Sequence, residues 1–317
     1  MKAMLTPTRL ALIGMICCLL FVSALFAGCT QSTTTTPTTA TPTEIPATPV
    51  PTTVEVAPTA APTTVAPTAT PAPSFTPSAN NLVVYTAASL TGASKTIGSS
   101  FTKAYPSTTV SFDLDGTQAL KTQVENGAYA DVFISASNSY TNTLKSEGYF
   151  VDGTVQPLAT NYIIVILPPA NTANIQSLAD LAKPGVKIAI EQKAVPAGTA
   201  TLAVIGNLAN DTLSQSWANA TMSNVVTQET SEPAVAAKVA LGEVDAGFVY
   251  QSTATAAPSG TYTTLTIPQK DNYLQTYTIG ILKGSQNKAA AAEFEQYMLS
   301  SAGQQILAQY GFSAPPK

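Results

Sequence analysis

The sequence contains no histidine and few charged residues of any kind. Lys, Arg, Asp and Glu together make up 10% of the 317 residues, and the formal net charge is -4. Without histidine the chain can form neither a Ser-His-Asp nor a Cys-His triad, nor any metal site with an imidazole ligand. No other nucleophile-base pair or cluster of metal ligands stands out. We therefore expect a protein that is not an enzyme, has no cofactor and does not bind nucleic acid.

Cysteine is also scarce. Two of the three cysteines, Cys17 and Cys18, lie in an N-terminal apolar run, which leaves Cys29 alone in the rest of the chain. A disulfide bond within that remainder is excluded, so its stability must come from a hydrophobic core.

The N-terminus has the pattern of an export signal. A basic start precedes an apolar run from Leu10 to Phe26, and the small residues Ala27-Gly28 follow. Residues 1–28 are therefore predicted to be a signal peptide. Cys29 comes next and resembles the lipidated cysteine of a lipobox, so we expect a lipid anchor there. The alternative is that the apolar run stays as a transmembrane anchor; both place the protein at the outer face of the cell membrane.

Residues 29–80 are almost wholly Thr, Pro, Ala and Val. Such a segment cannot form a core, and its frequent prolines keep it extended. We expect a disordered, semi-rigid tether between the membrane and the folded part. The Thr/Pro composition suits O-glycosylation, and Asn210 and Asn219 begin N-glycosylation sequons. The sequence leaves the occupancy of these sites open.

Beyond the tether, short apolar segments alternate with helical patterns. Residues 83–85, 110–112 and 132–134 read as buried strands. Between the first two, Leu90, Ala93, Ile97 and Phe101 recur at helical spacing and predict one buried helix face. This alternation predicts an α/β fold with helices on both faces of a sheet.

Four short turns, each between a predicted strand and a predicted helix, are the most informative feature of the chain. None contains Lys or Arg, yet a helix start offers unpaired N–H groups and the positive end of the helix dipole. Several such starts meeting in one cleft can hold a small dianion. The turns are Ala87-Ala88-Ser89-Leu90, Gly116-Thr117-Gln118-Ala119, Val195-Pro196-Ala197-Gly198 and Thr230-Ser231-Glu232-Pro233.

With Val249-Tyr250 closing the series, the order and spacing of these turns resemble the molybdate-binding proteins of ABC importers. The resemblance covers residues 82–312. It implies two Rossmann-like lobes joined by a two-strand hinge, the type II periplasmic binding protein fold. Lobe 1 would contain residues 81–161 and 278–317, and lobe 2 residues 162–277. Two crossings between the lobes would let them close over a ligand.

The resemblance also assigns residues to an oxyanion site. Ser89 would bind through its hydroxyl and backbone N–H, and Thr117, where the family usually has Ser, through its hydroxyl. Ala197 would donate its backbone N–H, and Tyr250 its hydroxyl. The alternatives are ordinary helix capping for Ser89 and Thr117, and a core position for Tyr250.

Glu232 occupies a position where the family typically has Val, whose backbone N–H binds the anion. We expect the N–H of Glu232 to serve in the same way and its carboxylate, repelled by a dianion, to point away. The register is open by one residue at two places, where Gln118 is the next candidate after Thr117 and Ser231 the fallback for Glu232.

The resemblance implies an extracytoplasmic substrate-binding lipoprotein of an ABC transporter that captures molybdate and tungstate. Its partners would be the oxyanion and the permease subunits, and it would act as a monomer; the metal is present only within the anion. A site of donors alone would reject hydrogen phosphate, whose proton would find no acceptor, and would reject sulfate by size. The alternatives are a sulfate or other oxyanion binding protein and a surface sensor or adhesion module.

Overall fold

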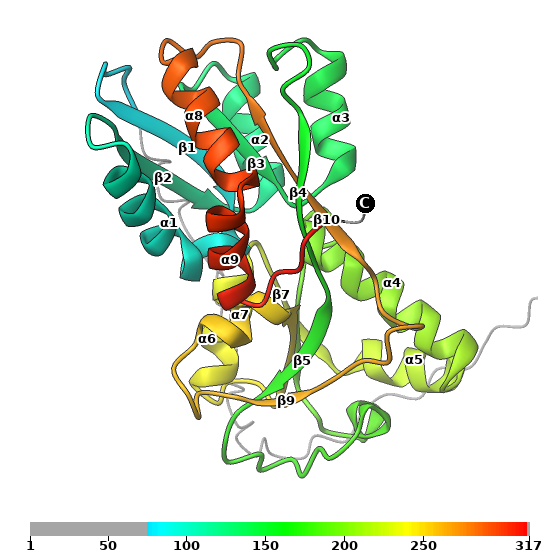
Figure 1. Ribbon diagram of the computed structural model, residues 1–317. Coiled ribbons are helices and arrows are strands. Elements are labelled where there is room, and N and C mark those ends of the chain that lie inside the picture. Colours follow the sequence, from blue (N-terminus) through cyan, green and yellow to red (C-terminus); the bar gives the residue numbers. More distant parts are fainter. Residues whose placement is uncertain (1–74, 316–317) are drawn as a thin grey trace, which may run out of the picture. The chain divides into compact units, whose positions relative to one another are not determined.

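The computed structural model describes residues 75–315, and its fold is the predicted α/β architecture of two lobes (Figure 1). The predicted signal peptide, Cys29 and all but the end of the predicted tether lie outside these residues. They therefore stay predictions. Within the described residues, no helix is long and apolar enough to cross a membrane.

Lobe 1 is built on a five-stranded sheet with the strand order β2-β1-β3-β10-β4. Its first three strands are parallel, whereas β10 runs antiparallel to both β3 and β4. The strands are β1 (Asn81–Ala87), β2 (Thr109–Asp115), β3 (Val132–Ser135), β4 (Gln156–Asn161) and β10 (Gln275–Ile281).

Alternating side chains of β1 enter two separate cores, one on each face of the sheet. Leu82 and Val84 lie in the core with helices α1 (Thr91–Ala104), α8 (Lys288–Leu299) and α9 (Ser301–Gln309). Val83 and Tyr85 face α2 (Thr117–Glu125) and α3 (Asn138–Ser146). This alternation is what a strand covered on both faces requires. The predicted helical face is buried as expected, because Leu90, directly before α1, and Ala93, Ile97 and Phe101 of α1 are each no more than 2% exposed.

Lobe 2 repeats the plan with a sheet of order β7-β6-β8-β5-β9. Strands β7, β6 and β8 are parallel, and β5 runs antiparallel to both of its neighbours. The strands are β5 (Ile163–Leu167), β6 (Ile188–Glu191), β7 (Val225–Glu229), β8 (Ala246–Tyr250) and β9 (Thr263–Leu265).

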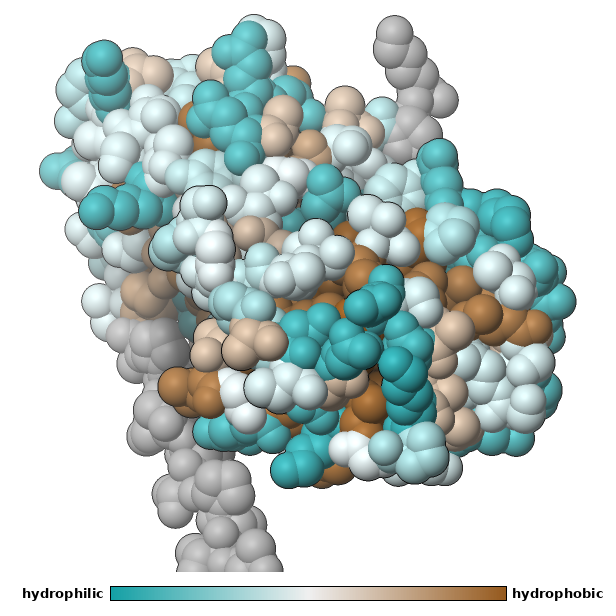
Figure 2. Space-filling view, turned by 90° about the horizontal axis from the view of Figure 1, so that it is seen from below, coloured by the Kyte–Doolittle hydropathy of each residue, from teal (hydrophilic) through white to brown (hydrophobic). Residues whose placement is uncertain are grey.

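Helices cover both faces of this second sheet as well. Helices α4 (Pro196–Asp211) and α5 (Gln215–Ser223) pack on one face, where Val204 and Trp217 join the core. Helix α6 (Glu232–Ala240) packs on the other face through Val235 and Val239. Helix α7 (Gln251–Ala256) follows β8, and two 3-10 helices, η1 (Ala88–Leu90) and η2 (Leu178–Ala182), complete the elements. On the face of the molecule seen from below, hydrophilic side chains predominate and apolar ones form separate areas (Figure 2).

The chain crosses between the lobes twice. Strand β4 of lobe 1 is followed after one residue, Tyr162, by β5 of lobe 2, and the chain returns between β9 and β10. The antiparallel strand beside the parallel strands in each sheet, β10 in lobe 1 and β5 in lobe 2, thus begins just after a crossing. Near the C-terminus, Ser313 pairs with Thr160 of β4 and fixes the tail beside the first crossing.

The structured part begins earlier than the composition predicts. Phe75 lies within the predicted tether, but its ring packs edge-on against Tyr85, with 6.3 Å between ring centroids. It thereby joins the core on one face of the lobe 1 sheet. Phe75 is the only aromatic residue between Thr30 and Asn80. The packing of this ring, together with the hydrogen bond from the side-chain amide of Asn287 to the carbonyl oxygen of Ser78 at 3.1 Å, attaches this end of the segment to lobe 1.

Candidate functional site

All four turns singled out in the sequence follow parallel strands and begin helices. Helix η1 follows β1, α2 follows β2, α4 follows β6 and α6 follows β7. In open α/β sheets, ligands bind outside the carboxyl ends of the parallel strands. The fold thus brings two helix starts from lobe 1 and two from lobe 2 to the cleft between the sheets.

These four helix starts have no side-chain cap. The residues before them, Ala87, Gly116, Val195 and Ser231, accept no hydrogen bond through a side chain from the first turn. By contrast, α3, α5 and α9 each begin with a serine whose hydroxyl accepts a backbone N–H. First-turn N–H groups have no partner within a helix. Those facing the cleft therefore remain available to a ligand.

The helix starts surround a small cavity between the lobes, with a volume of about 10 Å³. Four of the five predicted site residues line it, together with one acidic residue that the sequence analysis did not select. These residues are Thr117, Ala197, Glu232, Tyr250 and Glu191. Sites for organic ligands typically measure about 300–1,000 Å³, so this cavity is far too small for one. Its volume corresponds to the space of about one water molecule, so a larger ion would require the lining to move outward slightly.

Ser89, the fifth predicted residue, is buried beside the cavity but does not line it. Its hydroxyl lies 2.8 Å from the hydroxyl of Tyr277, and its carbonyl oxygen accepts a hydrogen bond from Ser252 at 3.4 Å. The Ser89 side chain thus connects η1 to β10. Its backbone N–H belongs to the first turn of η1.

Thr117 presents its hydroxyl at the start of α2 and is 1% exposed. The hydroxyl oxygen accepts the backbone N–H of Ala136 at 3.1 Å, which leaves the hydroxyl proton free to donate. The neighbouring Gln118 instead reaches across to lobe 2, where its amide donates to the carbonyl oxygen of Thr230 at 3.3 Å. Of the two candidates for this position, Thr117 is the one that lines the cavity.

The start of α4 allows a close approach of backbone to backbone. Pro196 occupies the first turn, where its missing N–H costs nothing. A Cβ atom on Gly198 would lie 2.0 Å from the carbonyl oxygen of Gln192, so only glycine fits there. Ala197, between them, is buried and lines the cavity.

The sequence predicted that the Glu232 carboxylate points away from the site, but in the structure it is buried. The residue is 4% exposed, and its carboxyl Oε1 accepts the backbone N–H of Tyr250 at 3.2 Å and the hydroxyl of Thr253 at 3.0 Å. Burial raises the pKa of Glu232 to about 7, and these two donors together with Ser89 oppose the rise only in part. The carboxyl group is turned into the protein because β8 and α7 supply these two hydrogen-bond donors there.

Glu191 is the residue that the sequence analysis missed. It ends β6, is 1% exposed, and neither of its carboxyl oxygens has a hydrogen-bond partner among the described residues. Burial and, next, the neighbouring Glu232 raise the pKa of Glu191 to about 9, against the smaller opposing influence of the N–H groups of Gly198 and Ala197. Its position could have identified it as a site residue, because a charged residue at the carboxyl end of a buried parallel strand lies where ligands bind in such folds.

The expectation of a site made of donors alone is therefore wrong. Glu191 and Glu232 are acceptors when ionised, and each becomes a donor only when protonated. An ionised Glu191 or Glu232 could accept the proton of hydrogen phosphate, so phosphate is not rejected for want of an acceptor.

Tyr250 lies where the sequence analysis placed it, at the end of β8, and is fully buried. Its hydroxyl donates to the side-chain oxygen of Gln275 at 3.0 Å, and its ring packs edge-on against Tyr277 with 6.0 Å between centroids. Burial raises the pKa of Tyr250 well above the ordinary value of a tyrosine. The side chain is therefore neutral and connects lobe 2 to the returning strand β10.

Direct contacts join the two lobes around the cavity. The Tyr140 hydroxyl of α3 donates to the carbonyl oxygen of Ala194 at 2.5 Å, in addition to the Gln118 and Ser252 contacts described above. Gly92 of α1 approaches α7 so closely that a Cβ atom on it would lie 2.2 Å from the Cβ atom of Ala256. The described arrangement is thus a closed one.

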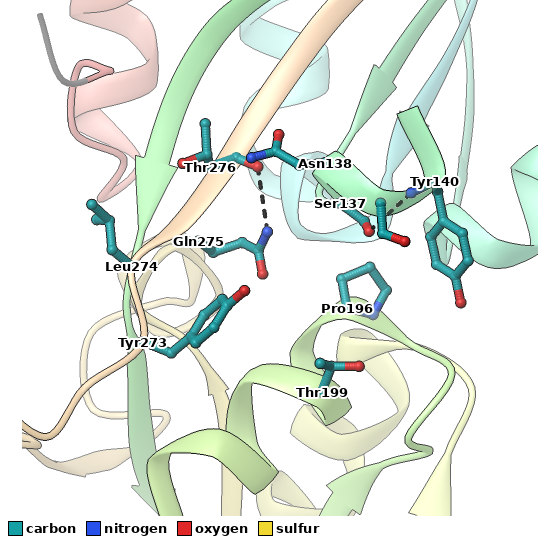
Figure 3. A pocket seen from close by; sticks show the side chains of 10 residues that line it. Ser137, Asn138, Tyr140, Pro196, Thr199, Tyr273, Leu274, Gln275 and Thr276 are labelled. Carbon is teal, nitrogen blue, oxygen red and sulfur yellow. Dashed lines mark hydrogen bonds between the residues drawn. The ribbon is translucent and has the colours of Figure 1, made fainter. Parts of the chain in front are cut away.

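A wider pocket of about 270 Å³ lies next to the cavity, and Pro196 belongs to the wall of both (Figure 3). Ser137 and Tyr140 at the start of α3 line it from lobe 1, and Thr199 of α4 from lobe 2. Gln275 points into it from β10. This pocket contains no charged side chain in its lining. It differs in this from the small cavity, where two carboxyl groups meet.

Comparisons with known proteins agree with this geometry. Residues 82–313 match the family described as bacterial extracellular solute-binding protein. The molybdate-binding protein ModA of Mycobacterium tuberculosis is 33% identical over 76% of this chain and 87% of its own length, and that of Haemophilus influenzae is 28% identical over 76% and 92%. The structure of the periplasmic molybdate-binding protein of Azotobacter vinelandii superposes with a TM-score of 0.64 at 23% identity, covering 74% of this chain and 100% of that chain. The sequence resemblance is thereby confirmed, and the chain belongs to the bacterial extracellular solute-binding proteins.

Proposed function

We propose that the protein captures molybdate outside the cytoplasm and delivers it to the permease of an ABC importer. Tungstate, an anion of the same charge and nearly the same size, would bind as well. Thr117 and the backbone N–H groups of Ser89, Ala197 and Glu232 would hold the anion. The Tyr250 hydroxyl would join them by exchanging its hydrogen bond to Gln275 for one to the anion. The relatives from Mycobacterium tuberculosis and Haemophilus influenzae, which each cover 76% of the chain, are molybdate-binding proteins, and this supports the choice of anion.

One observation above all supports this function. Four helix starts without side-chain caps meet at a cavity of about 10 Å³ that draws its lining from both lobes. Uncapped N–H groups and the positive ends of helix dipoles favour an anion. A ligand held between two lobes also stabilises the closed arrangement, which a permease can recognise.

The test is thermal unfolding of the full-length protein, purified in detergent, with each of four oxyanions. Molybdate and tungstate at about 100 times the dissociation constant should stabilise the native state by roughly 2.7 kcal/mol. This corresponds to a rise in Tm on the order of 5–10 °C for a protein of this size. Sulfate and phosphate are smaller tetrahedral anions that cannot reach all the donors at once, so both should give smaller shifts. An equal or larger shift with sulfate would favour the alternative of a sulfate-binding protein, and no shift with any anion would contradict the proposal.

We also propose that a lipid on Cys29 attaches the protein to the outer face of the membrane through the segment 29–80, and that the protein acts as a monomer. Cys29→Ser should release it into the soluble fraction, because a processed chain has no other apolar segment for the bilayer. A Cys29→Ser variant that stays in the membrane fraction would favour the uncleaved anchor.

A further inference from the structure

We propose that Glu191 and Glu232 bind the anion as protonated carboxylic acids, so that capture of the anion takes up protons from solution. This inference rests on the proposed function, because it describes how the same cavity accepts an oxyanion. It adds Glu191 to the residues that contact the anion. It also gives the Glu232 side chain a role beyond that of its backbone N–H.

Glu191 and Glu232 are both placed where an anion in the cavity would lie. Both line the cavity, from β6 and from the start of α6, and both are more than nine-tenths buried. The two Glu191 oxygens have no hydrogen-bond partner in the described part of the chain. Glu232 has partners for one oxygen, the N–H of Tyr250 and the hydroxyl of Thr253. At least one carboxyl group is therefore free to bond to whatever enters the cavity.

Within residues 75–315, no positively charged side chain lies against the two glutamates. Glu232 is the charged group that acts on Glu191, and the backbone N–H groups of Gly198 and Ala197 oppose it only in part. Tyr250 of β8 and Tyr277 of β10 also lie within range of Glu191, and both are neutral. Lobe 1 contributes the hydroxyls of Ser89 and Thr117, which are neutral. Neither glutamate belongs to an ion pair among the described residues.

The lysines nearest in sequence do not change this picture. Lys193, two residues beyond Glu191, is exposed to solvent. Lys238, on the same helix as Glu232, pairs with Glu229 and Glu243 instead. No basic side chain lines the cavity.

A dianion cannot share this cavity with two carboxylates. Like charges repel most strongly where water is excluded, and here four negative charges would meet without a cation. Protonation removes the repulsion and converts each carboxyl group from an acceptor into an O–H donor. A hydrogen bond from O–H to an anionic oxygen is short and strong. The protons come from solution, and each ends on a carboxyl oxygen that faces the anion.

The pKa values place this coupling in an accessible range. Burial raises the pKa of Glu232 to about 7 and that of Glu191 to about 9 in the protein without ligand. Below about pH 7 both groups are then already protonated, and binding should depend little on pH. Between about pH 7 and pH 9 each anion should take up close to one proton, so that affinity falls about tenfold per pH unit.

Isothermal titration of the full-length protein with sodium molybdate tests this directly. Titrations between about pH 6 and pH 9, each in two phosphate-free buffers of different ionisation enthalpy, give the affinity and the number of protons taken up. We expect the dissociation constant to be independent of pH below about pH 7 and to rise about tenfold per pH unit above it. The number of protons taken up on binding should increase over the same pH range. Glu232→Gln, a neutral isostere of the acid, should abolish the rise that begins near pH 7.

Glu191→Gln should keep the rise in the dissociation constant that begins near pH 7 but remove the further loss of affinity near pH 9. The Glu191→Gln Glu232→Gln variant should have the same affinity at every pH in the range. The matched control is Glu295→Gln, because burial raises the pKa of Glu295 to about 7 as well, but on α8 and away from the cavity. It should keep the wild-type dependence on pH.

Three outcomes decide between the ideas. Wild-type affinity that is independent of pH, with no proton uptake, would overturn the coupling but leave the proposed function standing. A Glu191→Gln Glu232→Gln variant, or both single variants, with the wild-type dependence would overturn the assignment to these residues. No binding of molybdate, tungstate or sulfate at any pH would instead contradict the proposed function itself.

Discussion

The two lobes contribute chemically different halves to the cavity. Lobe 1 supplies the starts of η1 and α2 and the Thr117 hydroxyl, none of which ionises under ordinary conditions. Lobe 2 supplies the starts of α4 and α6 together with two buried carboxyl groups, Glu191 and Glu232. The lobes differ in their ionisable groups and not in their fold, because the two sheets have the same arrangement of parallel and antiparallel strands.

This difference separates two roles. The donors of lobe 1 are the same at any pH near neutrality, so their contribution to anion binding should be constant. The carboxyl groups of lobe 2 are donors only when protonated, so their contribution should vary with pH. Changes in lobe 1 should therefore shift the whole binding curve, and changes in lobe 2 should alter its shape.

The largest expected effect is on the stability of the protein without ligand. In the folded state the pKa values of Glu191 and Glu232 are raised, to about 9 and about 7, above the value of about 4.3 of an unfolded chain. Their contribution is fully present below the unfolded value and is lost as pH rises through the folded values. The free energy of unfolding should fall by up to about 1.4 kcal/mol per pH unit for each group in that range.

Urea denaturation at several pH values between about 5 and 9 measures this dependence. Glu191→Gln Glu232→Gln should flatten most of it, and Glu295 and Asp113, whose pKa values burial also raises, should account for the remainder. Asp180 and Asp271 do not interfere, because their pKa values are lowered and they are ionised throughout this range. A double variant as sensitive to pH as the wild type would show that the two halves do not differ in the proposed way.

Thr117→Val tests the contribution of lobe 1 to binding, which should not depend on pH. The substitution keeps the shape of the side chain but removes the donor hydroxyl, and the affinity for molybdate should fall by roughly 1.5–3 kcal/mol. It also leaves the N–H of Ala136 without its acceptor, which costs a further about 1–3 kcal/mol of stability. Calorimetry should show the same loss of affinity at about pH 6 and pH 8, and Thr117→Ser should restore it. A loss that varies with pH would connect Thr117 to the titrating pair.

The elements of lobe 1 could be predicted closely because their signals are local. Leu82 and Val84, the helical spacing of Ile97 and Phe101, and the apolar run of β3 each identify an element without reference to the rest of the chain. The polar helix α3 was not identified, and the edge strand β7 was predicted only as the strand before the Thr230 turn, without bounds. Helix α3 has few apolar residues, and β7 is half exposed along its length, so neither has a strong period.

The candidate site was predicted in its positions but not in its electrostatics. The positions of Thr117, Ala197 and Tyr250 depend on the turns in which they lie, and those turns are visible in the sequence. The inward orientation of Glu232 depends on donors from Tyr250 and Thr253, which reach it only after β8 and α6 have packed. Glu191 in turn is perturbed by Glu232, 41 residues later in the sequence. Such a pairing is a property of the tertiary structure and has no local signal.

The smallest effect concerns the contact where the two halves meet. Gly92 of lobe 1 lies so close to Ala256 of lobe 2 that Gly92→Ala would place two Cβ atoms 2.2 Å apart in the closed arrangement. Helices α1 and α7 would have to move apart, which opposes closure but not the folding of either lobe. We expect the affinity for molybdate to fall roughly fivefold, equivalent to about 1 kcal/mol and to the lower end of overpacking costs, at every pH.

Two further variants show whether that loss arises at the contact. Ala256→Gly in the same protein removes the opposing Cβ atom and should restore most of the affinity. Gly206→Ala in α4 is the matched control, because a Cβ atom there meets nothing within 4 Å and should leave binding unchanged. Small-angle scattering with and without molybdate should show a smaller ligand-induced compaction in Gly92→Ala than in the wild type. If Gly92→Ala bound molybdate and became compact like the wild type, the contact between α1 and α7 would not limit closure of the lobes. Closure would then depend on the residues around the cavity.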